Sequence, residues 1–252
     1  MLVSEYGKEL RGRLDMSSFT CDISLNGFQI QGPDRELTKV AFAVDAAYET
    51  IDRAAEAGAE LLVVHHGMFW GRPLAVTGSH YQRLKRAMDA GLSLFACHLP
   101  LDAHPLYGNN AQMCLTMGMT SYDPFYAFKG KYIGFKGRLP FPMTVSEIAR
   151  LLGFTGKPGV IALEFGKERV ETVGVISGNG GNDVGEAIDE GLDLHITGTC
   201  PHEVYHLCKE NHMNLLSGGH YLSEIFGVKA LERMAVKEFG LSTVFLDAET
   251  GL

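Results

Sequence analysis

Short apolar runs alternate along the chain with segments of helical periodicity, and this alternation gives the first prediction about the fold. Leu61–Val64 is a continuous apolar run, as expected of a strand buried on both faces of a parallel sheet. Gly58 and Gly91 stand where predicted helices end, a typical position for glycine. The first half of the chain predicts a helix at 5–14, strands at 39–44, 61–64 and 92–96, and helices at 46–58 and 81–90. Such alternation indicates an α/β fold with a mostly parallel sheet.

The second half of the chain follows the same plan. It predicts strands at 170–176, 192–197 and 214–217, helices at 183–190 and 202–211, and then a helix at 221–239 and a strand at 243–246. Residues 40–66 align without a gap with residues 173–199, which sets Gly58 opposite Gly191. An internal duplication would explain the common order of elements, and convergent strand–helix–strand patterning is the alternative.

The region between the halves is rich in proline and glycine. Residues 125–169 are expected to hold short strands and a helix at 144–152 that begins with a capping box. We therefore predict two similar α/β lobes related by a pseudo-two-fold axis. The predicted first lobe is residues 1–124 plus 225–252, and the second is residues 125–224.

Composition narrows the class of protein. Of the 252 residues, 46% are hydrophobic and 21% are charged, which is ordinary globular usage. The net charge of −8 disfavours nucleic-acid binding through a broad basic face. Five cysteines without a Cys-x-x-Cys pair are typical of reduced thiols. No signal peptide and no apolar run of about 18 residues is present, so we expect a cytoplasmic protein without a membrane partner.

Three groups of histidines and acidic residues follow directly after predicted buried strands. They are His65-His66, His98-Leu-Pro-Leu-Asp102 and His220-Tyr-Leu-Ser-Glu224. Open α/β sheets bind ligands at the carboxyl ends of their strands, where the loops leave space. Chance clustering of polar residues at strand ends is the alternative to a common site.

The second and third groups share the form His-x-x-x-acid, so a duplication would place them on opposite sides of one cleft. The counterparts of His65-His66 in the second half are Gly198-Thr199, which cannot replace imidazole ligands. The histidine pair is therefore expected on one wall only.

Imidazole and carboxylate groups together suit Zn, Fe, Mn or Ni. Three or four histidines with two carboxylates exceed the ligands of one tetrahedral structural site. They suit two ions with positions open to water, and two ions roughly 3.5–4 Å apart need a bridging group. The sequence therefore predicts two divalent metal ions. His195, inside a predicted strand, is expected to be a hydrogen-bonded core residue, and His104 a supporting one.

Two further features have two interpretations each. The segment Ser177–Asp183 joins a strand to a helix and could bind an anion through backbone N–H groups, or could be a plain tight turn. Trp70 follows the histidine pair closely and could form a wall of the site or pack in the core.

The motifs around these residues resemble one known family. Val-Val-His65-His66-Gly, the segment His98–Gln112 and Gly219-His220-Tyr-Leu-Ser-Glu224 are similar to motifs of the dinuclear metal-centre family of GTP cyclohydrolase I type 2 homologues, related to NGG-interacting factors. Asn26–Ile30 and Ser177–Gly181 resemble an early segment and a Gly-rich turn of that family. The resemblance covers nearly the whole chain and indicates its short form, without an inserted domain.

The resemblance implies a two-metal site in the cleft between the lobes, and assembly of the protein with itself into a homohexameric ring. It implies as metal ligands His65, His66, Asp102, His220 and Glu224, with His98 as an added or alternative ligand and Glu224 or Asp102 as the bridge. One position departs from the family: Thr199 follows Ile-Thr-Gly, where members often carry an acid. Threonine is a poor base near pH 7, which weakens a catalytic interpretation.

Two functions remain open. The first is a metal-dependent hydrolase, GTP cyclohydrolase-like, that acts on a nucleotide or another phosphorylated small molecule. The second is a non-catalytic protein that binds or delivers metal, or that regulates a partner. The residues do not assign a catalytic group in either case.

Overall fold

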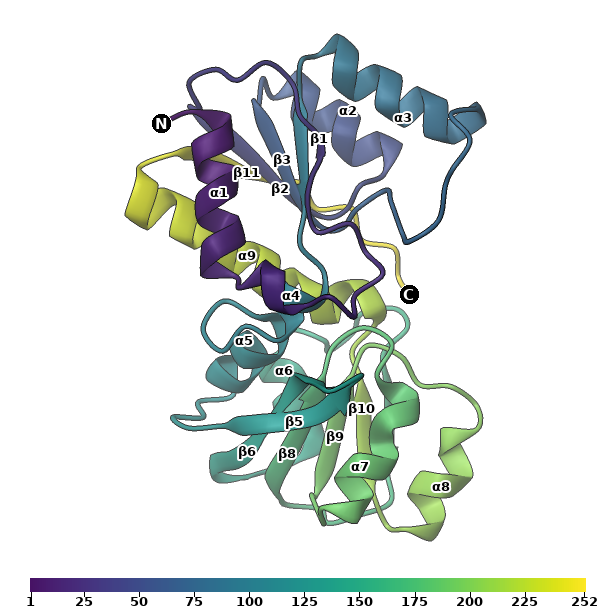
Figure 1. Cartoon of the computed structure of the whole chain (residues 1–252). Coiled ribbons are helices and arrows are strands. Elements are labelled where there is room, and N and C mark those ends of the chain that lie inside the picture. Colours follow the sequence, from purple (N-terminus) through teal and green to yellow (C-terminus); the bar gives the residue numbers. More distant parts are fainter. The chain divides into compact units, whose positions relative to one another are not determined.

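The computed structural model describes all 252 residues, and their contacts divide the chain into two compact units. Unit 1 is Met1–Leu101 with Val228–Ala248, and unit 2 is Asp102–Gly227 with Glu249–Leu252. Each unit contains one β-sheet with helices packed on it (Figure 1). The predicted α/β class with two lobes is therefore confirmed.

Unit 1 is built on a five-stranded sheet with the order β1-β4-β3-β2-β11. Strands β2, β3, β4 and β11 are parallel, and β1 runs antiparallel to β4. Its elements are α1 (Val3–Arg13), η1 (Met16–Ser18), β1 (Gly27–Ile30), β2 (Lys39–Asp45), α2 (Tyr48–Glu56), β3 (Leu61–His66), α3 (Gly78–Asp89), β4 (Ser93–Ala96) and β11 (Ser242–Phe245). The short helix α4 (Leu99–Asp102) and the long helix α9 (His220–Phe239) each continue from one unit into the other.

The core of unit 1 explains why its central strands are apolar throughout. Leu61 to Val64 of β3 are all 0–1% exposed, because both faces of the sheet are covered. Leu62 and Val64 pack against Ile51 of α2 and Leu84 of α3 in one cluster. Helix α1 lies on the opposite side of the sheet from α2 and α3 (Figure 1).

Unit 2 is built on a six-stranded sheet with the order β5-β6-β8-β9-β10-β7. Strands β8, β9 and β10 are parallel, and the others run antiparallel to their neighbours. Its elements are α5 (Asn109–Thr116), β5 (Asp123–Phe128), β6 (Lys131–Met143), α6 (Val145–Leu151), β7 (Ile161–Glu164), β8 (Val170–Ile176), η2 (Gly181–Asp183), α7 (Val184–Asp189), β9 (Leu194–Thr197), α8 (Val204–Glu210) and β10 (Asn214–Ser217).

The two units share one topology. The path β2-α2-β3-α3-β4 of unit 1 corresponds to β8-α7-β9-α8-β10 of unit 2, and in each sheet an antiparallel strand pairs with the last of these strands. Gly58 and Gly191, which the ungapped alignment sets opposite each other, both follow a helix and have φ of 67° and 65°. This common order supports the predicted duplication.

The middle of the chain differs from the expectations in two details. Contacts place the end of the first part of unit 1 at Leu101, whereas the predicted boundary lies at 124, and α5 packs on β6 and β8 of unit 2. The expected short strands include β6, which has 13 residues. Its register shifts between Arg138 and Met143, and this irregular stretch accommodates Pro140 and Pro142, which have no N–H to donate.

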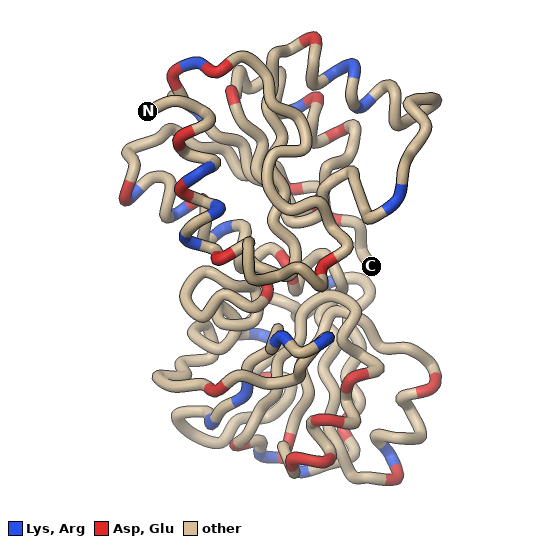
Figure 2. The backbone as a smooth tube through the Cα atoms, viewed as in Figure 1, with Lys and Arg blue, Asp and Glu red and all other residues tan.

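Basic and acidic positions are interspersed in both units (Figure 2). Opposite charges pair across elements, as Arg13 does with Glu238 and Lys157 with Glu249. None of the helices combines the length and the apolar composition that a membrane-spanning segment requires.

Asp193, just before β9, gives a stability prediction. Its carboxylate accepts hydrogen bonds from the Glu171 and Thr172 N–H groups and pairs with Lys167. Burial raises the pKa of Asp193, but these partners outweigh burial and lower the pKa below its usual value. The resulting stabilisation is complete above the unfolded-state pKa of about 3.9 and is lost as the pH falls through the lower folded-state pKa.

Asp193→Asn is therefore expected to lower the free energy of unfolding by about 1–2 kcal/mol at pH 7. The difference from the unchanged protein should shrink as the pH falls below about 4, which urea unfolding at a series of pH values measures. A difference that is as large at pH 3 as at pH 7 would contradict this account of Asp193.

Candidate metal centre

Three histidines come together in unit 1 at the carboxyl ends of adjacent parallel strands. His65 and His66 end β3, and His98 follows β4. One ring nitrogen from each lies within 4.8 Å of those of the other two. The ring centroids are 4.5 Å apart for His65 and His66, and 5.2 Å apart for His65 and His98. We call these three residues the imidazole cluster.

Each ring in the imidazole cluster is oriented by a hydrogen bond from Nδ1. His65 Nδ1–H donates to the Cys97 carbonyl at 2.9 Å, and His66 Nδ1–H donates to Asp45 at 2.9 Å. His98 Nδ1–H donates to Asp22 Oδ1 at 3.0 Å.

These acceptors place the ring proton on Nδ1 of each histidine, so that Nε2 carries the lone pair that binds a metal. Metal-binding histidines usually have such a partner on the other nitrogen. The residues present therefore fit a divalent metal ion.

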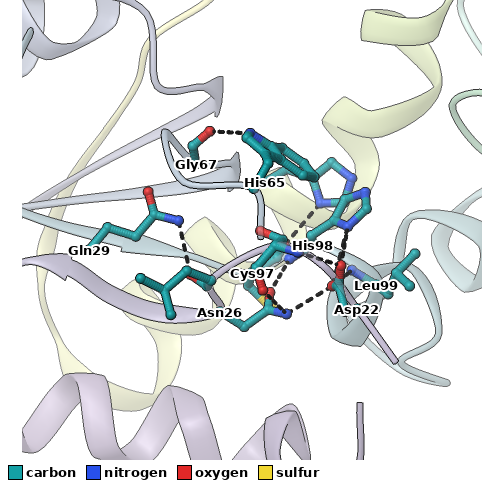
Figure 3. Close-up of polar contacts among 11 residues, drawn as sticks. Asp22, Asn26, Gln29, His65, Gly67, Cys97, His98 and Leu99 are labelled. Atoms are coloured by element: carbon teal, nitrogen blue, oxygen red, sulfur yellow. Dashed lines mark hydrogen bonds and ion pairs between the residues drawn. The ribbon is translucent and has the colours of Figure 1, made fainter. Parts of the chain in front are cut away.

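The loop before β1 holds His98 from two sides (Figure 3). Asp22 accepts from His98 Nδ1–H and from the Leu99 N–H, and the Asn26 side chain accepts from the His98 N–H. Burial raises the pKa of the Asp22 carboxyl, but His98, Asn26 and the Ser24 N–H outweigh burial and lower that pKa below its usual value. Asp22 is therefore a carboxylate near neutral pH.

Trp70 lies against the imidazole cluster. Its ring centroid is 4.9 Å from that of His98 and 5.8 Å from that of His66. Its indole N–H donates to the Gly67 carbonyl at 2.9 Å, which fixes the ring. Of the two interpretations of Trp70, the wall of the site is the one that the structure supports.

Unit 2 holds the other predicted ligands. Glu224 lies one turn after His220 at the start of α9, and His220 Nε2 is 3.2 Å from Glu224 Oε1. A carboxylate oxygen of Asp102 lies within 4.8 Å of one from Glu224. Asp102 and Glu224 are only 6% and 3% exposed. We call Asp102, His220 and Glu224 the acidic cluster.

A buried polar network orients Asp102. Its Oδ1 accepts from the side chains of Asn109 at 2.9 Å and Ser177 at 3.0 Å. Asn110 donates to the Asp102 carbonyl and accepts from the Ser177 N–H at 2.6 Å. These bonds leave the carboxylate little rotational freedom, as a group that binds a metal requires.

The Gly-rich loop supports the acidic cluster. The first two N–H groups, of Ser177 and Gly178, donate to the side chains of Asn110 and Ser223, so these two groups are already paired within the protein. Gly178 has φ +62°, and a Cβ there would lie 2.3 Å from Glu224 Oε1. The loop therefore packs on a candidate ligand, and two of its N–H groups serve to hold its own backbone.

His195 and His104 both form hydrogen bonds with the backbone. His195 is 0% exposed, and its Nε2–H donates to the Gly180 carbonyl at 2.8 Å, which confirms the predicted core role. Burial lowers the pKa of His195 to about 4, although the bond to Gly180 raises it. His104 Nδ1 accepts from the N–H groups of Leu106 and Tyr107 and so stabilises a local turn. Thr199 donates to the Asn179 side chain at 3.0 Å.

Several supporting residues were missed by sequence reasoning. Asp22 lies outside the motifs that identified the candidate ligands. Asp45 is the last residue of the apolar strand β2. A polar residue at the end of an apolar strand is the same signal that identified the histidines. Asn109 and Asn110 were noted within a motif, but their contacts with Asp102 and Ser177 were not predicted.

The fold and the site define a class: an α/β protein with two sheets, in which histidines and carboxylates gather where parallel strands end. Comparison with known proteins names the family. A model of the DUF34/NIF3 (NGG1p interacting factor 3) family matches residues 1–251, and the chain belongs to this family.

Individual relatives agree with this assignment. The chain is 44% identical to a "GTP cyclohydrolase 1 type 2 homolog" of Deinococcus radiodurans, over 92% of this chain and 88% of the relative. It is 42% identical to a protein of the same description from Archaeoglobus fulgidus, over 100% of both chains. The crystal structure of TTHA1606 from Thermus thermophilus is 37% identical, covers 100% of both chains and has a TM-score of 0.90.

Proposed function

We propose that the protein binds two divalent metal ions through the imidazole cluster and the acidic cluster together. The proposed ligands are His65, His66, Asp102, His220 and Glu224, with His98 as an additional ligand. His98 and Asp102 are separated by only three residues, so the chain itself limits the distance between a histidine of one cluster and a carboxylate of the other.

The observation that carries this proposal is the common orientation of the imidazole cluster. All three rings use Nδ1 for a carbonyl or carboxylate acceptor, although those acceptors come from three different segments. Histidines that only lie on the surface or pack in the core need not all form their hydrogen bonds through the same ring nitrogen. Neutral imidazoles with carboxylates favour Zn, Fe, Mn or Ni over Ca or Mg.

Glu224 is the proposed bridging ligand. It is buried, it lies beside His220, and its carboxylate is near that of Asp102. A carboxylate in that position would help to hold a pair of ions close together, and its negative charge would offset their repulsion. Asp102, whose Oδ1 already accepts from Asn109 and Ser177, suits a terminal ligand better.

We propose that the protein is a metal-dependent hydrolase of a nucleotide or another phosphorylated small molecule. When bound, a pair of divalent ions generates a nucleophile from water near neutral pH and polarises an electrophile. The chain would contribute fixed imidazole and carboxylate positions, while the Trp70 ring covers one side of the imidazole cluster. The description of the relatives makes GTP the first substrate to test.

Thr199 favours a second candidate, a non-catalytic metal-binding protein. Its hydroxyl donates to Asn179 and is a poor proton acceptor near pH 7. A protein that stores, delivers or senses metal needs the two clusters but no group for proton transfer.

Turnover measurements distinguish the two candidates. Metal-loaded protein should hydrolyse GTP or a member of a phosphoester panel, and Glu224→Gln should reduce kcat at least about 100-fold, because the isosteric amide removes the proposed bridging charge. Glu210→Gln, at an exposed position of α8, is the matched control. Turnover that Glu224→Gln leaves unchanged would remove the hydrolase, whereas tight metal binding without turnover would favour the non-catalytic protein.

A further inference from the structure

We infer that Asp22 is a positioning residue that prepares His98 as a metal ligand, and this inference rests on the proposed metal-binding function. Asp22 lies outside every motif that pointed to the site. Its side chain is 1% exposed and lies in the loop between η1 and β1, 76 residues from His98 in the chain.

Every partner of the Asp22 carboxylate is a hydrogen-bond donor. Oδ1 accepts from the Ser24 N–H at 2.9 Å and from His98 Nδ1–H at 3.0 Å. Oδ2 accepts from the Asn26 side chain at 2.8 Å and from the Leu99 N–H at 3.1 Å. Only an acceptor without hydrogens satisfies all of these donors, and an ionised carboxylate is such a group.

This arrangement decides which nitrogen of His98 can bind a metal. Because Asp22 offers only acceptors, the proton of the neutral His98 ring resides on Nδ1, and Nε2 keeps its lone pair. The Asn26 side chain links Asp22 to the backbone of His98, since it donates to the Asp22 carboxylate and accepts from the His98 N–H at 2.8 Å. The loop therefore fixes both the backbone and the ring of His98.

His98 belongs to the imidazole cluster, so the orientation that Asp22 gives its ring affects the proposed metal binding. Its ring nitrogen is grouped with those of His65 and His66, and Trp70 packs edge-on against the His98 ring on another side. Without Asp22 the ring could rotate or change tautomer, and the site would lose one of three imidazole nitrogens. Loss of a residue that orients a ligand typically weakens metal binding 10–100-fold.

The test is a double-mutant cycle on metal affinity. Asp22→Ala, Asp22→Asn, His98→Ala and the variant with both Asp22→Ala and His98→Ala are titrated with Co²⁺ against a chelator, and the visible Co²⁺ absorption is recorded. Asp22→Asn is included because it keeps the size of the side chain but turns an N–H₂ group toward donors. Asp34→Asn is the matched control, since Asp34 also accepts a backbone and a side-chain hydrogen bond, both from Ser4, in the same unit.

We expect both Asp22 variants to bind one Co²⁺ about 10–100-fold more weakly and to change its absorption spectrum, with Asp34→Asn unchanged. In the His98→Ala background, Asp22→Ala should cause no further loss, because its effect passes through His98. An equal loss in both backgrounds, or unchanged affinity and spectrum in both Asp22 variants, would overturn the inference. An unchanged protein that binds no Co²⁺ would overturn the proposed function itself, and the inference with it.

Discussion

Replacing His65 is expected to release metal from the protein. His65 is fully buried, and its Nδ1 bond to the Cys97 carbonyl orients the ring within the imidazole cluster. In the proposed centre this ring binds one of the two ions, and an alanine there supplies no ligand. We expect His65→Ala to contain at most one metal equivalent per chain, and the unchanged protein to contain two. Metal analysis after purification in chelator-treated buffer measures this.

Two further variants make the result specific to the ligand. His65→Gln fills more of the space in the buried site than alanine does, so its metal loss cannot be attributed to a cavity. His206→Ala removes an exposed histidine of α8 and should leave the metal content unchanged. Two equivalents of metal in both His65 variants would show that His65 is not a ligand.

Gly178→Ala is expected to disturb the acidic cluster although it replaces no proposed ligand. The backbone there has φ +62°, which costs a residue with a Cβ roughly 1–2 kcal/mol, and the new Cβ would lie 2.3 Å from Glu224 Oε1. Because the backbone of this loop is held by Ser223 and Gly198, the Glu224 carboxylate must move. We expect metal affinity to fall at least about tenfold, measured by chelator competition.

Gly191→Ala is the matched control for this effect. Gly191 has φ +65°, but a Cβ there meets no atom within 4 Å. It should lower the free energy of unfolding by a similar roughly 1–2 kcal/mol while metal affinity stays unchanged. Equal metal affinities for the two variants would show that contact with Glu224 has no part in metal binding.

Most of the parallel strands were predictable from the sequence, because burial on both faces leaves an unbroken apolar run. The strands at 170–176 and 214–217 match β8 and β10. The prolines of β6 obscured that strand, since Pro140 and Pro142 signal a break and only the bulged pairing with β8 accommodates them. Helix α5 was not predicted, and it packs on β6 within unit 2.

The candidate ligands were predictable for a related reason: a polar side chain directly after a buried strand stands out. His65, His98 and His220 all gave this signal. The residues that orient them did not, because their role depends on hydrogen bonds between distant segments. Asp22 and His98 are 76 residues apart, and Ser177 and Asp102 are 75 apart. A single sequence contains no pattern that relates such pairs.

The central claim is that two metal ions share one set of imidazole and carboxylate ligands. Crystals grown from metal-replete protein, with diffraction recorded above and below the absorption edge of the bound metal, test it most directly. The account predicts two anomalous peaks per chain, one next to His65 and one next to His66. An anomalous map without a peak at these side chains would contradict it.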